Sequence, residues 1–231
     1  MASEPRELRW LVRLGQTWHG FDAGLWWSQE GMLGSNRVVL AANGAGRANA
    51  GRVVERLSDR FPVRAVISTG SCGGLDPVLP AGRVVVAERV LSLSPAGEFA
   101  ARIPDCPPAV EITRGAVLTV DRFVQTREEK RSLRSTGAVA VEMESAGVAA
   151  EAHNRGLPFY CVRAVSDDAA TSFQIDFNRA RRPDGRFSRA RVVARAGMRP
   201  ARWKELLGLW RVDRAASRAL GEFLGQCQFE R

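Results

Sequence analysis

The chain has 231 residues, of which 45% are hydrophobic and 26% charged, and its formal net charge is +9. This composition fits one globular domain with a sizeable core and excludes general disorder. No apolar run approaches the roughly 20 residues that a bilayer-spanning helix needs, and charged residues occupy the N-terminal segment where a secretory signal requires an apolar stretch. We therefore expect a soluble, cytoplasmic protein.

Short β-branched runs alternate with helical segments through residues 1–177. The predicted strands cover residues 37–42, 63–69, 84–90, 116–120, 139–141 and 159–165. The predicted helices cover residues 47–61, 128–135 and 145–155, and Gly156 with Pro158 just beyond ends the last of them. Strands followed by helices predict an α/β fold whose sheet is covered on both faces.

Residues 178–231 differ from the rest of the chain in charge. They contain 13 Arg and one Lys against five acidic residues, so their net charge of +9 equals that of the whole chain. Trp203, Leu206, Leu207 and Trp210 recur at helical spacing, which predicts a long amphipathic helix. We therefore divide the chain into a body, residues 1–177, and a basic helical extension, residues 178–231. The extension either faces an anionic partner or is a solvated helical face of the same domain.

Several familiar motifs are excluded by their spacing. The dinucleotide fingerprint would need a third glycine where the chain has Asn49, and residues 70–73 form neither a nucleophile elbow nor a phosphate loop. The four cysteines are widely separated and the two histidines are isolated, so neither a zinc site nor a disulfide scaffold is predicted. We expect no metal and no cofactor.

Three polar segments remain, each at the end of a predicted strand. They are Thr69-Gly-Ser-Cys-Gly-Gly74, Val141-Glu-Met-Glu-Ser145 and Val162-Arg-Ala-Val-Ser-Asp-Asp168. Glycines let backbone N–H groups approach an anion or a sugar oxygen closely, whereas burying two glutamates without purpose would be costly. Because open α/β sheets bind ligands at the carboxyl ends of their strands, we expect the three segments to converge on one crevice.

In this order and at these separations, the three segments resemble the superfamily of purine nucleoside phosphorylases and methylthioadenosine/S-adenosylhomocysteine nucleosidases. The resemblance spans roughly residues 4–168. It implies a three-layer α/β/α sandwich with a central mixed, twisted sheet, and a homo-oligomer that acts on small purine nucleosides. Because the chain begins almost on the segment that holds Glu7, we expect the first strand of the family to be missing.

The resemblance also implies roles for individual residues. Asp167 matches the general acid that protonates the purine at N7, and Ser166 and Arg163 match residues that orient it. Glu144 matches the carboxylate that binds the ribose hydroxyls. The remaining predicted contacts are Met143 and Glu142 at the ribose, Phe123 and Val124 at the base, and Ser71 and Gly73 on the side of the nucleophile.

The nucleophile is either water or phosphate. Glu7 lies where nucleosidases keep the carboxylate that activates water, and Ser68 occupies the position at which bacterial phosphorylases of the family have an arginine. Since a phosphate dianion needs charged donors, this favours hydrolysis, although Arg47 at a helix N-terminus can supply phosphate binding instead. We predict a nucleosidase for adenosine-type compounds such as methylthioadenosine, with a phosphate-dependent phosphorylase as the alternative.

The extension carries a weaker resemblance of its own. Arg181-Arg-Pro-Asp-Gly-Arg186, followed by an arginine-rich helical region, is similar to the ends of hopanoid-associated phosphorylases. This similarity implies a lipid-linked nucleoside, such as adenosylhopane, as an alternative substrate, and weak contact of the extension with a membrane surface. A second alternative is a non-catalytic module that binds nucleic acid or a membrane, of which nucleic acid is the less expected partner.

Overall fold

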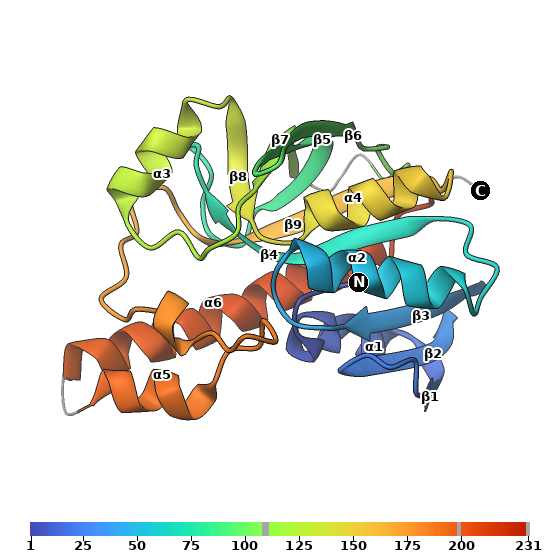
Figure 1. Cartoon of the computed structure of the whole chain (residues 1–231), viewed down its shortest axis with the longest axis horizontal. Coiled ribbons are helices and arrows are strands. Elements are labelled where there is room, and N and C mark those ends of the chain that lie inside the picture. The colour runs from blue at the N-terminus through green and yellow to red at the C-terminus, as the bar shows by residue number, and fades with distance from the viewer. Residues whose placement is uncertain (108–110, 198–199, 230–231) are drawn as a thin grey trace.

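The computed structural model describes residues 1–107, 111–197 and 200–229. Its larger sheet is mixed and has six strands in the order β6-β5-β7-β8-β4-β9. Because β9 also pairs with β5, the sheet closes on itself from β5 to β9 (Figure 1). The strands are β4 (Val66–Gly74), β5 (Val84–Leu93), β6 (Ala96–Ala100), β7 (Ile112–Thr119), β8 (Ala138–Glu142) and β9 (Phe159–Asp167).

A second, three-stranded antiparallel sheet precedes the first along the chain. It consists of β1 (Gln16–Gly20), β2 (Trp27–Leu33) and β3 (Asn36–Ala42). The residues described before β1 include no strand; instead, the amide of Ala2 donates to the carbonyl of Ala41 of β3 at 3.0 Å, while the carbonyl of Met1 accepts from Thr69 of β4 at 2.9 Å. The first two residues therefore bridge the two sheets.

Helices cover both faces of the larger sheet. On one face α2 (Arg47–Ser58) and α4 (Ser145–Asn154) pack side by side, and on the other α1 (Arg9–Leu14) packs with α6 (Pro200–Leu224) (Figure 1). Side chains alternate along β5, so the strand contributes to the hydrophobic cluster on each face of the sheet. Val85 packs in the cluster under α2 and α4, whereas Val84 and Val86 pack in the cluster under α1 and α6. The remaining helices are the 3₁₀ turns η1 (Pro5–Leu8) and η2 (Asn178–Ala180), α3 (Arg127–Arg134) and α5 (Arg189–Ala196).

Each predicted strand and helix is present, with one informative change at β4. The predicted strand ends at residue 69, but β4 continues to Gly74 because the glycine-rich segment pairs in parallel with β9. Gly70 has a φ of 136°, and a Cβ there would lie 2.7 Å from Oε1 of Glu7 and 3.0 Å from Nη1 of Arg163. Only glycine therefore lets two charged groups approach this strand. The sequence analysis gave no residue ranges for β1, β2, β6, α1 and α5.

The extension packs on the body. A disulfide joins Cys106, ahead of β7, to Cys227, just after α6, across 121 positions of sequence. Cysteine spacing did not predict this pair, because only the fold brings two such distant residues together. The hydroxyl of Ser217 on α6 also donates to the carbonyl of Glu7 at 3.0 Å. None of the helices in the described part of the chain combines the length and apolarity that crossing a bilayer requires.

Candidate active site

A cavity of about 460 Å³ opens where β4, β8 and β9 end. The three polar segments meet there, as the sequence predicted. Most of the predicted site residues line the cavity, namely Glu7, Ser71, Gly73, Phe123, Val124, Glu142, Met143, Glu144, Ser166 and Asp167. We call the polar members of this set, together with Gly73, the strand-end wall: Glu7, Ser71, Gly73, Glu142, Glu144, Ser166 and Asp167. Arg163 and Arg47 are not among the lining residues.

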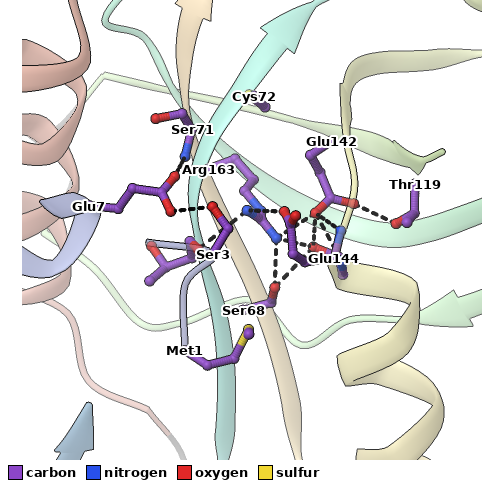
Figure 2. A network of polar contacts seen from close by, with 12 residues as sticks. Met1, Ser3, Glu7, Ser68, Ser71, Cys72, Thr119, Glu142, Glu144 and Arg163 are labelled. Carbon is purple, nitrogen blue, oxygen red and sulfur yellow. Dashed lines mark hydrogen bonds and ion pairs between the residues drawn. The ribbon is translucent and has the colours of Figure 1, made fainter. Parts of the chain in front are cut away.

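Glu7 is held rigidly at the edge of the cavity. Its Oε1 accepts from the amide of Ser71 at 2.8 Å, and its Oε2 accepts from the hydroxyl of Ser3 at 2.7 Å and from the amide of Glu4 at 2.9 Å (Figure 2). The last contact belongs to the capping box that starts η1. Glu7 is 8% exposed and its carboxylate has fixed donors on both oxygens, so its geometry suits accepting a proton from a bound water.

Arg163 lies fully buried beneath the cavity and joins two glutamates. Its guanidinium is 2.5 Å from Glu142 and 3.4 Å from Glu144, and it donates to the hydroxyls of Ser68 and Ser145 (Figure 2). Burial alone would lower the pKa of Arg163, but the two carboxylates, with Glu142 the stronger, raise it above its ordinary value. The structure therefore assigns Arg163 to the glutamates, which corrects its predicted role of orienting Asp167.

Glu142 is a structural anchor. Its Oε2 accepts from the amides of Glu144 and Ser145, each at 2.9 Å, and so caps the start of α4, while its Oε1 accepts from the hydroxyl of Thr119 at 2.5 Å. With Arg163 also bound, both oxygens are occupied. Glu142 therefore positions its neighbour Glu144, while its predicted contact with ribose stays a prediction.

Glu144 lines the cavity as well. The amide of Gly46 donates to its Oε1 at 3.1 Å. Burial, and next the nearby charge of Glu142, raise the pKa of Glu144 to about 8. Its position beside Met143 fits the predicted ribose contact, which remains a prediction.

Asp167 ends β9 and sits in a polar setting. The Ser166 hydroxyl donates to its Oδ1 at 2.5 Å, and the ammonium of Lys130, from α3, lies 2.5 Å from its Oδ2. Lys130 is fully buried, and the sequence analysis missed it because a lysine in a charge-rich helix usually points to solvent. A Cβ on Gly73 would lie 3.2 Å from Oδ2 of Asp167, so the glycine leaves room for this ion pair.

An aromatic cluster forms the predicted base side of the cavity. The ring of Phe123 packs against Phe173 and Phe177 with centroid distances of 5.4 and 5.0 Å. The side chain of Asn178 holds the backbone of Phe123 through hydrogen bonds of 2.8 and 2.9 Å. Phe177 also lines the cavity, and no sequence pattern had singled it out.

The extension supplies another part of the lining. We call its apolar side chains the helical wall: Val192 and Val193 of α5, and Trp203, Leu206, Leu207, Leu209 and Trp210 of α6. Trp210 is 64% exposed and Leu207 54%. The same helix places Asp213 in the cavity, 3.6 Å from Arg6, and burial raises the pKa of Asp213 above its ordinary value. The sequence analysis predicted the helix but did not predict that it lines the site.

Arg47 does not reach the cavity. At the start of α2 its guanidinium donates to the hydroxyl of Ser92 at 3.1 Å and to the carbonyl of Ser94. The predicted contribution of Arg47 to a phosphate site is therefore not met in this structure.

Comparison with known proteins places this geometry in a family. The sequence profile described as "Phosphorylase superfamily" matches residues 1–109 and 95–196. The chain belongs to the phosphorylase superfamily. One relative, the 5'-methylthioadenosine/S-adenosylhomocysteine nucleosidase of Mycobacterium bovis, is 30% identical over 195 residues, which cover 64% of this chain and 76% of the relative. The nucleosidase of Tolumonas auensis is 28% identical over 190 residues, covering 71% and 83% of the two chains.

Solved structures of other proteins share the fold. The nucleosidase of Neisseria meningitidis, in complex with methylthio-immucillin-A, matches with a TM-score of 0.70 at 22% identity, covering 97% of this chain and 96% of that one. Futalosine hydrolase of Helicobacter pylori matches with a TM-score of 0.72 at 17% identity, covering 97% and 94%. The predicted α/β/α architecture with a mixed central sheet is thus confirmed.

Proposed function

We propose that the protein is a purine nucleosidase that cleaves the N-glycosidic bond of an adenosine-type nucleoside, of the methylthioadenosine or S-adenosylhomocysteine kind. One observation carries the proposal: the carboxyl groups of Glu7, Glu144 and Asp167 line a single cavity from three different elements. The nucleosidase relatives support the same substrate class.

In the proposed reaction Asp167 donates its proton to N7 of the purine. The bond between C1′ and the base then breaks, its electrons stay with the base, and the ribose becomes oxocarbenium-like. Glu144 holds the ribose hydroxyls, and Glu7 takes a proton from the water that attacks C1′. Glu7 then releases its proton to solvent and Asp167 takes one up, so one water is consumed per turnover and no cofactor or metal takes part.

The charges on the nucleophile side favour water over phosphate. Glu4, Glu7 and Asp213 all line this side, and Arg6 pairs with Glu4 at 2.8 Å and with Asp213 at 3.6 Å. A phosphate dianion would be repelled by these carboxylates, whereas a neutral water would find acceptors for its protons. The position of Arg47 outside the cavity supports the same choice.

The test is an assay of adenine release. Purified protein is incubated with methylthioadenosine, S-adenosylhomocysteine, adenosine and inosine, with and without phosphate, and the products are separated by chromatography. We expect adenine from the first two compounds at a rate independent of phosphate. Strict dependence on phosphate, with a ribose 1-phosphate product, would replace hydrolysis by phosphorolysis.

A second candidate differs in the substrate. The exposed side chains of the helical wall favour a nucleoside with a large apolar 5′ group, such as a lipid-linked adenosine, because they would shelter it from water. A 5′-alkylthioadenosine series of increasing chain length tests this idea. If kcat/KM rises steadily with chain length, the lipid-linked substrate is favoured over methylthioadenosine.

Further proposals concern partners. We propose that the protein is cytoplasmic and forms a homo-oligomer, and that its basic extension makes weak contact with anionic membranes. We also propose that residues 178–231 serve the same site as residues 1–177. Vesicle flotation tests the membrane contact, and sedimentation tests the oligomeric state. Salt-sensitive binding of nucleic acid without any nucleosidase activity would instead favour the non-catalytic module.

A further inference from the structure

Lys130 is the buried residue of an otherwise polar helix. In α3, Arg127, Glu128, Arg131 and Arg134 are exposed, whereas Lys130 has no exposed surface. The orientation is fixed at the helix start, where the Thr126 hydroxyl accepts from the amide of Glu129 at 3.1 Å and the Glu129 carboxylate accepts from the amide of Thr126 at 3.2 Å. The capped start thus holds α3 in the orientation that turns Lys130 inward.

The ammonium of Lys130 is matched to the end of β9. It lies 2.5 Å from Oδ2 of Asp167 and 2.5 Å from the carbonyl oxygen of Asp168, and 5.9 Å from the ring centre of Phe173. Lys130 does not line the cavity, so it sits behind the carboxyl group that faces the substrate. Burying an ammonium is costly unless acceptors hold its protons, and here the acceptors are Oδ2 of Asp167 and the carbonyl oxygen of Asp168.

We propose that Lys130 is the positioning residue that makes Asp167 an effective acid. This inference rests on the proposed function. The ammonium fixes Oδ2, while the Ser166 hydroxyl fixes Oδ1, so the carboxyl group cannot rotate away from the base. When the Asp167 proton moves to N7 and the bond from C1′ to the base breaks, the carboxylate left behind is stabilised by an ammonium already in place. Lys130 keeps its own protons throughout the step.

The pair is not alone in its surroundings. The other ionisable side chains that line the cavity are Glu4, Arg6, Glu7, Cys72, Arg122, Glu142, Glu144 and Asp213, with Arg163 beneath them. Asp168 follows the acid along the chain and holds the Thr171 hydroxyl at 2.7 Å. All of these are the same in the variants below, so a change in pH dependence between variants reports the loss of the ammonium.

The experiment compares Lys130→Met with Arg131→Met, which removes an exposed cation from the next position of the same helix. The readout is kcat for adenine release from methylthioadenosine between pH 5 and pH 10. Lys130→Met removes the cation that stabilises the carboxylate left after proton transfer, so we expect kcat at the plateau to fall at least about tenfold. We expect the alkaline limb of the profile to move to higher pH. Arg131→Met should leave both unchanged.

If Lys130 had a purely structural role, replacing it would not move the alkaline limb of the kcat profile. The inference is overturned if Lys130→Met keeps the wild-type limb, or if its kcat stays within about twofold of wild type, a range too small for loss of acid strength. If Lys130→Met does not fold, Lys130→Gln and Lys130→Arg replace it: the arginine variant should keep the limb, the glutamine variant should shift it, and identical limbs would refute the proposal.

Failure of the proposed function has a separate signature. In that case the wild-type protein itself releases no base from any nucleoside, whatever Lys130 does. The pairing of Lys130 with Asp167 then remains measurable by thermal unfolding, where Asp167→Asn should lower Tm and Lys130→Met/Asp167→Asn should restore much of it. If the double variant is no more stable than Asp167→Asn, the pairing itself is refuted.

Discussion

The two walls of the cavity are built in opposite ways. The strand-end wall is polar and almost fully buried, and its carboxyl groups are each held by partners, as Arg163 holds Glu142 and Lys130 holds Asp167. The helical wall is apolar and half open to solvent, with Trp210 64% exposed. Buried charges tolerate little displacement, whereas apolar contacts adapt to many shapes.

From this difference we expect the strand-end wall to carry out the reaction and the helical wall to select the substrate. The strand-end wall holds the groups that would move protons, and their mutual contacts fix them before any ligand arrives. The helical wall offers area and no directional contacts, so it can select the 5′ group by size alone. Substitutions in the first wall should therefore affect turnover and stability together, and those in the second should affect neither for a small substrate.

The largest expected effect is at Asp167. Asp167→Asn removes the proposed acid, and kcat should fall about 10³- to 10⁴-fold. It also leaves the buried ammonium of Lys130 without its charge partner, so the free energy of unfolding should fall by about 3–5 kcal/mol. Steady-state kinetics and urea denaturation measure the two losses.

The matched control for Asp167→Asn is the double variant Lys130→Met/Asp167→Asn. It buries no unpaired charge, so most of the stability should return while the activity stays lost. An Asp167→Asn protein with wild-type turnover would remove Asp167 from the mechanism.

The next largest effect is expected at Glu7, where the activation of water can be tested separately from the binding of the base. Glu7→Gln keeps the shape and an acceptor for the Ser71 amide but cannot take a proton from water, so kcat should fall about 10²- to 10³-fold. Binding of adenine, measured by calorimetry, should hardly change. Equal losses in adenine affinity would show that Glu7 supports the cavity and does not act on water.

A third, pH-dependent effect concerns Glu144. Burial raises its pKa in the folded protein from 4.5 to about 8, so the folded state binds more protons than the unfolded state between these values. The contribution of this group to stability is fully present below pH 4.5 and is lost as the pH rises towards 8. Glu144→Gln should remove this part of the pH dependence, measured as Tm across that window, and should raise KM. If the plot of Tm against pH kept its slope in Glu144→Gln, the pH dependence would belong to other groups.

The smallest effect should come from the helical wall. Trp210→Ala should change kcat/KM for methylthioadenosine less than about threefold, because the small 5′ group needs little apolar area. For a nucleoside with a long 5′-alkylthio chain the loss should reach about tenfold. Val78→Ala, at an 83% exposed position outside the cavity, serves as the control. Equal losses in kcat/KM for both substrates would show that Trp210 supports the folding of α6 and does not contact the 5′ group.

The strand-end wall was largely predictable from sequence, for a physical reason. Strands pair in register, so glycine and acidic residues at the ends of β4, β8 and β9 had to meet once the alternation of strands and helices was recognised. The placement of Glu144 and Asp167 in one cavity followed from this, whereas the place of Glu7, on η1, was expected only from the family resemblance. The partners of each charge did not, because a side chain such as Arg163 can reach either of two neighbouring carboxylates.

The sequence alone determined the fold class, the cluster of acidic side chains at the strand ends and the amphipathic helix of the extension, because these depend on local periodicity and strand order. Only the tertiary structure decided that Lys130 turns inward, that Arg47 turns away and that Cys106 meets Cys227. Such contacts join segments far apart in sequence, where the packing of whole elements sets the distance and no local pattern records it.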